Sequence, residues 1–184
     1  MKPWYEELFT IFVKVFAGLE LGPASTTVVA EPGTGYDRAS SEDAIRRSIV
    51  VFTLDQIGED YVFAIEHAPG EANPEGWDCS ELTQNAYERA GLKYADGCVN
   101  QKAQIGHRRT VNPKPGDVFF FGPNKDGIPH TGIFTGRGTA VHALGGKVGH
   151  VVERSLAEVE AHPRFEGWFR HTDLAYPQED RANG

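Results

Sequence analysis

Apolar positions divide the chain into a helical first part and a strand-like second part. Between residues 40 and 90 the apolar side chains recur at the three- and four-residue spacing of a helix face. After Pro113 the period changes, and short runs rich in β-branched and aromatic residues are separated by glycine. Helices followed by strands predict an α+β domain in which the helices pack on an antiparallel sheet.

Capping and turn residues predict where these elements begin and end. Ser40 or Ser41 can cap a first helix, which Gly58 ends. Asp78 can cap a second helix that runs over residues 79–90, with Gly91 just beyond its end. The expected strands are residues 118–121, 130–135, 139–144 and 148–152.

The same pattern predicts three zones. Residues 1–39 are an N-terminal extension, residues 40–173 the folded domain and residues 174–184 a polar C-terminal tail. Within the extension, residues 4–21 can form an amphipathic helix. Two interpretations of this helix remain open, namely an extra element packed on the core and a docking segment for a partner.

Composition narrows the classes of function. A chain of 184 residues with 40% hydrophobic residues has enough apolar material for one domain core. The net charge of −8 gives no overall attraction to nucleic acid or anionic lipid. No apolar run reaches the ~20 residues of a membrane span, and the N-terminus lacks the pattern of a secretory signal. We therefore expect a protein made in a cytoplasm that reaches any outside target by another route.

One cysteine and two histidines form the candidate reactive group. Cys79 would occupy the first turn of the second helix, where the helix N-terminus lowers a thiol pKa and free N–H groups can stabilise an oxyanion. His130 and His142 are 12 residues apart on two expected neighbouring strands joined by a glycine-rich turn. This layout is typical of a cysteine nucleophile with a general base and an orienting third residue. Cys98, the other cysteine, is interpreted as a small packing residue.

Four segments in order resemble the NlpC/P60 cysteine peptidases, a papain-like family that cuts peptidoglycan stem peptides. The segments are Trp-Asp-Cys-Ser at 77–80, Pro-Gly-Asp-Val-Phe-Phe at 115–120, His-Thr-Gly-Ile-Phe at 130–134 and Val-His-Ala at 141–143. The resemblance covers residues 41–152. It implies a papain-like fold in which Cys79 is the nucleophile, His130 the base and His142 the orienting residue, with no metal and no cofactor.

The resemblance is weaker around the substrate pocket. Tyr61 matches a family tyrosine near the cleft, and we assign it to substrate binding together with Asp78 and Ser80. The loop over residues 67–76 is longer than usual in the family, and Glu81 stands where a glycine commonly follows. Substrate specificity is therefore not carried over from the family.

The setting and the alternatives follow from this resemblance. The run Glu-Leu-Thr at 81–83, directly after Cys79 and Ser80, is most similar to phage tail-associated wall hydrolases, so we expect a virion tail enzyme that opens the wall for DNA entry. The N-terminal segment would then contact other tail proteins. The alternatives are a phage lysin, an injected antibacterial amidase, a non-catalytic structural tail module and a zinc site made by Cys79, His130 and His142.

Overall fold

A six-stranded antiparallel sheet forms the centre of the part of the chain that the structure describes. The computed structural model describes residues 35–67, 71 and 75–174, with side chains from residue 41 onward. The helix expected at residues 4–21 and the tail beyond residue 174 lie outside this part. The strand order is β1-β6-β2-β3-β4-β5. The bounds are Arg109–Thr110 for β1, Val118–Phe121 for β2, His130–Phe134 for β3, Thr139–Leu144 for β4, His150–Ser155 for β5 and Phe165–Phe169 for β6.

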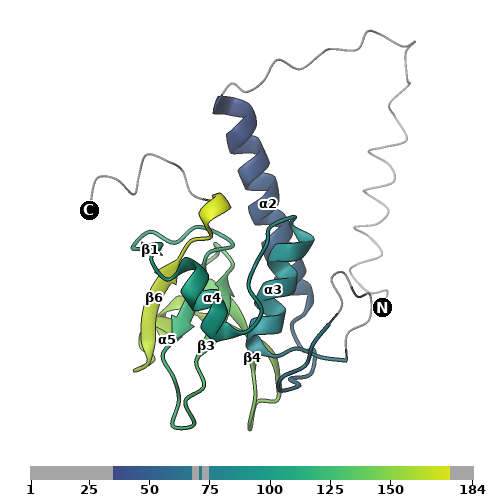
Figure 1. Ribbon diagram of the computed structural model, residues 1–184, viewed down its shortest axis with the longest axis vertical. Coiled ribbons are helices and arrows are strands. Elements are labelled where there is room, and N and C mark those ends of the chain that lie inside the picture. The colour runs from purple at the N-terminus through teal and green to yellow at the C-terminus, as the bar shows by residue number, and fades with distance from the viewer. Residues whose placement is uncertain (1–34, 68–70, 72–74, 175–184) are drawn as a thin grey trace, which may run out of the picture. The chain divides into compact units, whose positions relative to one another are not determined.

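Three helices precede the sheet in the sequence. They are α2 (Gly35–Asp55), α3 (Cys79–Arg89) and α4 (Cys98–Ile105), and Figure 1 shows α3 and α4 in front of the sheet. A short helix, α5 (Leu156–Glu160), connects β5 to β6, and a 3₁₀ turn (Thr172–Leu174) follows β6. This order of helices and strands confirms the predicted α+β class.

The predicted elements agree with the structure in most places and differ in three. The first helix begins at Gly35 instead of at Ser40 or Ser41, because no Gly or Pro interrupts residues 36–55 and serine is tolerated inside a helix at small cost. The last predicted strand is shifted from residues 148–152 to His150–Ser155, since Gly149 has a positive φ of 73°. The strands β1 and β6 and the helices α4 and α5 were not predicted.

The strand β2 is buried on both of its faces. Val118 and Phe120 contribute to the cluster that contains Ile49 and Tyr87 from the helices, whereas Phe119 and Phe121 pack with Trp168 on the opposite face. Because side chains alternate across a strand, such a position requires apolar residues throughout, which explains the run Val-Phe-Phe-Phe. The sheet is therefore covered on both sides at its centre.

A buried ion cluster joins α2, β2 and the segment after β6. Asp117, which is fully buried, accepts hydrogen bonds from Arg46 at 2.9 Å and from Arg170 at 3.0 Å. Its carboxylate also accepts from the N–H of Lys114 at 2.9 Å, as a residue that organises a turn does. Asp117 thus anchors the start of β2, and the structure gives it a packing role in the Pro-Gly-Asp segment.

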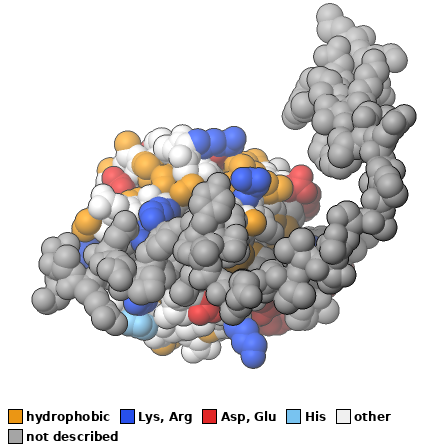
Figure 2. Space-filling model, turned by 90° about the horizontal axis from the view of Figure 1, so that it is seen from above, with side chains coloured by type: hydrophobic (Ala, Val, Ile, Leu, Met, Phe, Trp, Pro, Cys, Tyr) orange, Lys and Arg blue, Asp and Glu red, His pale blue; other side chains and the backbone are white. Residues whose placement is uncertain are grey.

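The described surface mixes both signs of charge. On the face seen in Figure 2, Lys and Arg side chains lie interspersed with Asp, Glu and apolar ones. Among the described residues, no helix has the length and apolar content needed to cross a membrane.

Candidate active site

The nucleophile candidate is positioned by a short bridge between two segments of the chain. Trp77 donates its N–H to the carbonyl of Asp60 at 2.8 Å, and Val62 donates to the carbonyl of Trp77 at 3.1 Å. Gly76 permits this approach, because a Cβ there would lie 2.6 Å from the carbonyl oxygen of Asp60. The bridge fixes Trp77 and, two residues later, Cys79 at the start of α3.

Asp78 caps α3 as predicted. Its carboxylate accepts from the N–H of Glu81 at 2.8 Å and from the hydroxyl of Ser80 at 2.9 Å, and its backbone is extended. Cys79 is therefore the first helical residue. Because the cap uses the N–H of Glu81, that donor is not available to an oxyanion.

The two histidines lie on neighbouring strands and contact each other. His130 is the first residue of β3, and Nε2 of its ring lies 2.9 Å from Nδ1 of His142 in β4. His142 points to the face of the sheet that carries Phe119 and Phe121, whose ring centroids lie 5.5 and 6.4 Å from its own. Since this pair occupies Nε2 of His130, Nδ1 of the same ring is the nitrogen left to face Cys79.

Two neighbours shape the space around these rings. Gly132 makes room for His142, because a Cβ on Gly132 would lie 2.7 Å from the Cβ of His142 and 2.6 Å from the ring of Phe119. Phe121 stacks on His130 with ring centroids 5.6 Å apart and an interplanar angle of 29°. Glycine in the segment His-Thr-Gly-Ile is thus a requirement of packing around the histidine pair.

Burial keeps His142 neutral. Desolvation, together with the neighbouring His130, Arg154 and His162, lowers the pKa of His142 to about 2. Its Nε2 atom is buried and has no hydrogen-bond partner among the described residues. A neutral imidazole can accept a hydrogen bond at Nδ1 from the ring N–H of His130, as an orienting residue does.

The neighbours of Cys79 favour its thiolate form. The thiol of Cys98 contributes most to a pKa well below the ordinary value for cysteine. His130 and the N–H of Thr131 add to this lowering, while burial opposes it. The interaction with Cys79 raises the pKa of the Cys98 thiol, which keeps its proton. The structure therefore brings together Cys79, His130 and His142, and adds Cys98 to them.

A cavity of about 730 Å³ opens beside this group. Cys79, His130, His142 and Tyr61 all line it. Burial, followed by the charges of Cys79 and Asp78, raises the pKa of Tyr61 to about 12, so its hydroxyl remains a hydrogen-bond donor near neutral pH. Asp78 and Ser80 are not among the lining residues, and their side chains bond to each other. The substrate-binding role of these two residues stays a prediction.

Several cavity residues were not identified from the sequence. His162 stacks on Phe121, with ring centroids 4.1 Å apart and an interplanar angle of 14°, and lines the cavity. Arg154 and Arg164 also line it. Outside the cavity, the side chains of His67 and His171 are buried, with 3% and 1% of their surface exposed. His67 packs on Trp77 and His171 on Tyr87, and residue type alone does not indicate these contacts.

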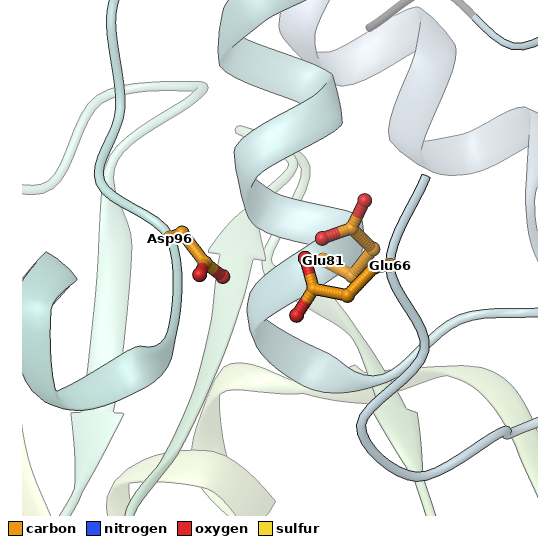
Figure 3. Close-up of side chains that lie close together, drawn as sticks. All are labelled: Glu66, Glu81 and Asp96. Carbon is orange, nitrogen blue, oxygen red and sulfur yellow. The ribbon is translucent and has the colours of Figure 1, made fainter. Parts of the chain in front are cut away.

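Glu81, in the first turn of α3, belongs to a cluster of three acidic residues. Figure 3 shows Glu66, Glu81 and Asp96, whose carboxylate oxygens lie within 4.8 Å of one another. This is the one set of three potential metal ligands at such distances within the described ranges, so Cys79, His130 and His142 do not form one there. Glu81 accepts from the N–H of His67 at 3.0 Å and from Asn85 at 2.9 Å. It thus ties the long loop before Cys79 to the helix.

A helix N-terminal cysteine facing two histidines on an antiparallel sheet defines a papain-like arrangement. Residues 58–169 match the NlpC/P60 family, and the chain belongs to that family. The matched residues contain Tyr61, Cys79, His130 and His142, so the resemblance inferred from the four segments is confirmed at the level of the family.

Curated relatives and solved structures agree with this assignment. The chain is 32% identical over 126 residues to a gamma-DL-glutamyl hydrolase of Bacillus subtilis, covering 67% of this chain and 29% of the relative. It is 27% identical over 125 residues to a probable endopeptidase of Corynebacterium glutamicum, covering 68% of this chain and 55% of the relative. The chain thus spans between about a third and about half the length of these relatives.

Two solved structures show the fold. The peptidoglycan hydrolase RipB of Mycobacterium tuberculosis has a TM-score of 0.59 at 18% identity, with 92% of this chain and 81% of that chain covered. RipD of the same organism, described as a non-catalytic NlpC/P60 domain protein adapted to peptidoglycan binding, has a TM-score of 0.53 at 20% identity, with 70% and 97% covered. The family therefore contains both kinds of protein, and the choice between them depends on the residues of the site.

Proposed function

We propose that the protein is a cysteine peptidase that hydrolyses amide bonds of peptidoglycan stem peptides. The observation that carries the proposal is that Cys79 and the hydrogen-bonded pair His130 and His142 line the same cavity, with His130 as the histidine that acts on the thiol of Cys79. This set of three residues contains a nucleophile, a base and an orienting residue. The names of the relatives, an endopeptidase and a gamma-glutamyl hydrolase, support amide hydrolysis as the reaction.

In the proposed mechanism each member of the set has one role. The thiolate of Cys79 attacks the carbonyl carbon of the scissile amide, and His130 gives a proton to the departing amine. Water then loses a proton to His130 and adds to the thioester, which releases the acid fragment and restores the thiolate. His142 stays neutral and holds the ring of His130 in one orientation throughout.

Product analysis tests this proposal directly. The purified full chain is incubated with cell-wall sacculi, with defined muropeptides and with poly-γ-glutamate, and the products are identified by mass spectrometry. We expect new amine and carboxyl termini within stem peptides. The Cys79→Ala variant should have the thermal stability of the wild type but should release no peptide fragments. Release by the alanine variant at the wild-type rate would contradict the thiol mechanism. Binding of walls by both proteins without any release would instead place the chain with non-catalytic wall-binding domains.

We further propose that the enzyme acts from a phage tail. The support is the similarity of the segment after Cys79 to tail-associated hydrolases. Detection of the chain by peptide mass spectrometry in purified virions tests this setting. A chain found only in lysates, and never in particles, would favour a lysin.

A further inference from the structure

The second cysteine lies against the proposed nucleophile. The thiols of Cys98 and Cys79 are close enough for each to shift the pKa of the other, and the sequence contains no other cysteine. Both are free thiols, each with 7% of its surface exposed. Each is also the first residue of its helix, Cys79 in α3 and Cys98 in α4.

Side-chain hydrogen bonds hold the two helix starts together. Gln101, one turn after Cys98, donates to the carbonyl of Ser80 at 2.8 Å and accepts from the hydroxyl of Thr83 at 2.9 Å. Gln101 and Thr83 are fully buried. Because buried, mutually satisfied polar groups fix the relative position of the elements that carry them, the contact between the two sulfurs is part of the packing of α3 on α4.

The two thiols differ in access and in protonation. Cys79 lines the cavity, so a small solute in the cavity reaches its sulfur, whereas Cys98 is not among the lining residues. Thiolates are the form that peroxides oxidise. An oxidant entering the cavity therefore meets a reactive thiolate with a protonated thiol directly behind it.

We propose that Cys79 and Cys98 form a reversible disulfide that switches the site off under peroxide and protects Cys79 from further oxidation. Cys79 thiolate displaces hydroxide from hydrogen peroxide and becomes a sulfenic acid. Cys98 then attacks that sulfur, the new sulfur–sulfur bond forms, and the thiol proton leaves with the hydroxyl group as water. Peroxide is the oxidant and accepts both electrons. The regulatory meaning rests on the proposed function, since it requires Cys79 to be the nucleophile.

Mass spectrometry of the full chain tests the disulfide without any wall substrate. Trypsin places Cys79 in residues 48–89 and Cys98 in residues 94–102, so a bridge links two separate peptides. After treatment with hydrogen peroxide and a maleimide quench, we expect an intact monomer that is about 2 Da lighter than the reduced protein. Its tryptic digest should contain the two peptides linked to each other. Dithiothreitol should restore both thiols and the labelling of Cys79 by iodoacetamide.

Cys98→Ser is the matched variant, because its hydroxyl keeps a donor beside Cys79 but cannot form the bridge. It should give a dimedone adduct on Cys79 at low peroxide and a gain of about 32 Da at high peroxide that dithiothreitol does not reverse. A wild-type protein that shows this same gain on Cys79 while Cys98 is labelled by maleimide would overturn the proposal, and so would a Cys79 that peroxide leaves unchanged. Failure of wall hydrolysis would refute the proposed function alone, because the mass readout does not depend on it.

Discussion

Nε2 of His130 lies 2.9 Å from Nδ1 of His142, and this contact determines which ring nitrogen of His130 can face Cys79. His142 is buried, with its pKa lowered to about 2, first by desolvation and then by the neighbouring His130, Arg154 and His162. His142 therefore stays neutral beside His130. In the proposed mechanism His130 is the residue that exchanges protons, and His142 is the residue that orients it.

Replacing His142 should slow the reaction without weakening substrate binding. His142→Ala removes the acceptor for His130, so we expect kcat to fall by about 10²-fold with KM little changed, because orientation acts on the transfer of a proton. His130→Ala should lose all measurable turnover. The measurement is steady-state kinetics on a defined muropeptide, with His150→Ala, an exposed histidine on β5, as control. A rise in KM at unchanged kcat would assign His142 to substrate binding.

The reactivity of Cys79 should depend on its contact with Cys98. Because that contact contributes most to the lowered pKa of Cys79, Cys98→Ala should move the pH midpoint of iodoacetamide labelling at Cys79 upward. The thiolate is the form that reacts, so the rate falls as pH falls through this midpoint. Cys98→Ser should stay nearer to the wild type. Identical midpoints in all three proteins would mean that Cys98 does not act on the thiolate.

Adding one methyl group at Gly132 should disturb the histidine pair. The Cβ of Gly132→Ala would lie 2.7 Å from the Cβ of His142 and 2.8 Å from the carbonyl oxygen of Val141. Overpacking of this kind costs about 1–3 kcal/mol in the free energy of unfolding. Gly122→Ala is the control, since its nearest neighbour is a flexible glutamate side chain at 3.2 Å. Urea denaturation should separate the two variants, and equal stabilities would contradict the packing argument.

The sequence predicted the placement of the candidate site residues because that placement depends on short local patterns. Asp78 and Gly91 bound α3 as their residue types indicate, and β2, β3 and β4 begin where turn residues precede them. These signals place Cys79, His130 and His142 on definite elements. The resemblance of four segments, in the same order, to the NlpC/P60 family then predicted the fold.

The parts that escaped prediction depend on contacts between distant segments. Cys98 lies 19 residues from Cys79, in a short helix that begins after a glycine without a side-chain cap, so no local pattern indicates that their sulfurs meet. Arg46 and Arg170 reach Asp117 from opposite ends of the domain. His162 enters the cavity because the α5–β6 connection folds back over Phe121. The periodicity of apolar residues along the chain does not indicate contacts between residues that are distant in the sequence.

Removing the buried carboxylate of Asp117 should destabilise the fold. Asp117→Ala leaves Arg46 and Arg170, both about 4% exposed, without their shared counter-charge. Breaking a buried pair in this way costs about 3–5 kcal/mol. Arg137→Ala is the control, because its ion pair with Glu153 is exposed and such pairs contribute about 0–1 kcal/mol. Denaturation midpoints measure both, and similar small losses in the two variants would show that the buried cluster is not needed for stability.

Glu81 should make the stability of the protein fall as pH rises towards 7. Burial, followed in smaller part by the charges of Glu66 and Asp78, raises the pKa of Glu81 to about 7. In the unfolded chain a glutamate titrates near 4.3, so between about pH 4.3 and 7 the folded protein binds more protons than the unfolded one. Stability must then decrease with rising pH across this window.

Glu81→Gln removes this dependence while keeping an oxygen that can accept from His67 and Asn85. We expect the free energy of unfolding of the variant, minus that of the wild type, to increase from pH 5 to pH 7.5. The change in the difference reports on Glu81 and its interaction with His67, because groups that do not interact with Glu81 contribute equally in both proteins. Glu59→Gln, at an exposed position, should show no such trend. A difference that does not change with pH would mean that Glu81 ionises in the folded protein as it does in the unfolded chain.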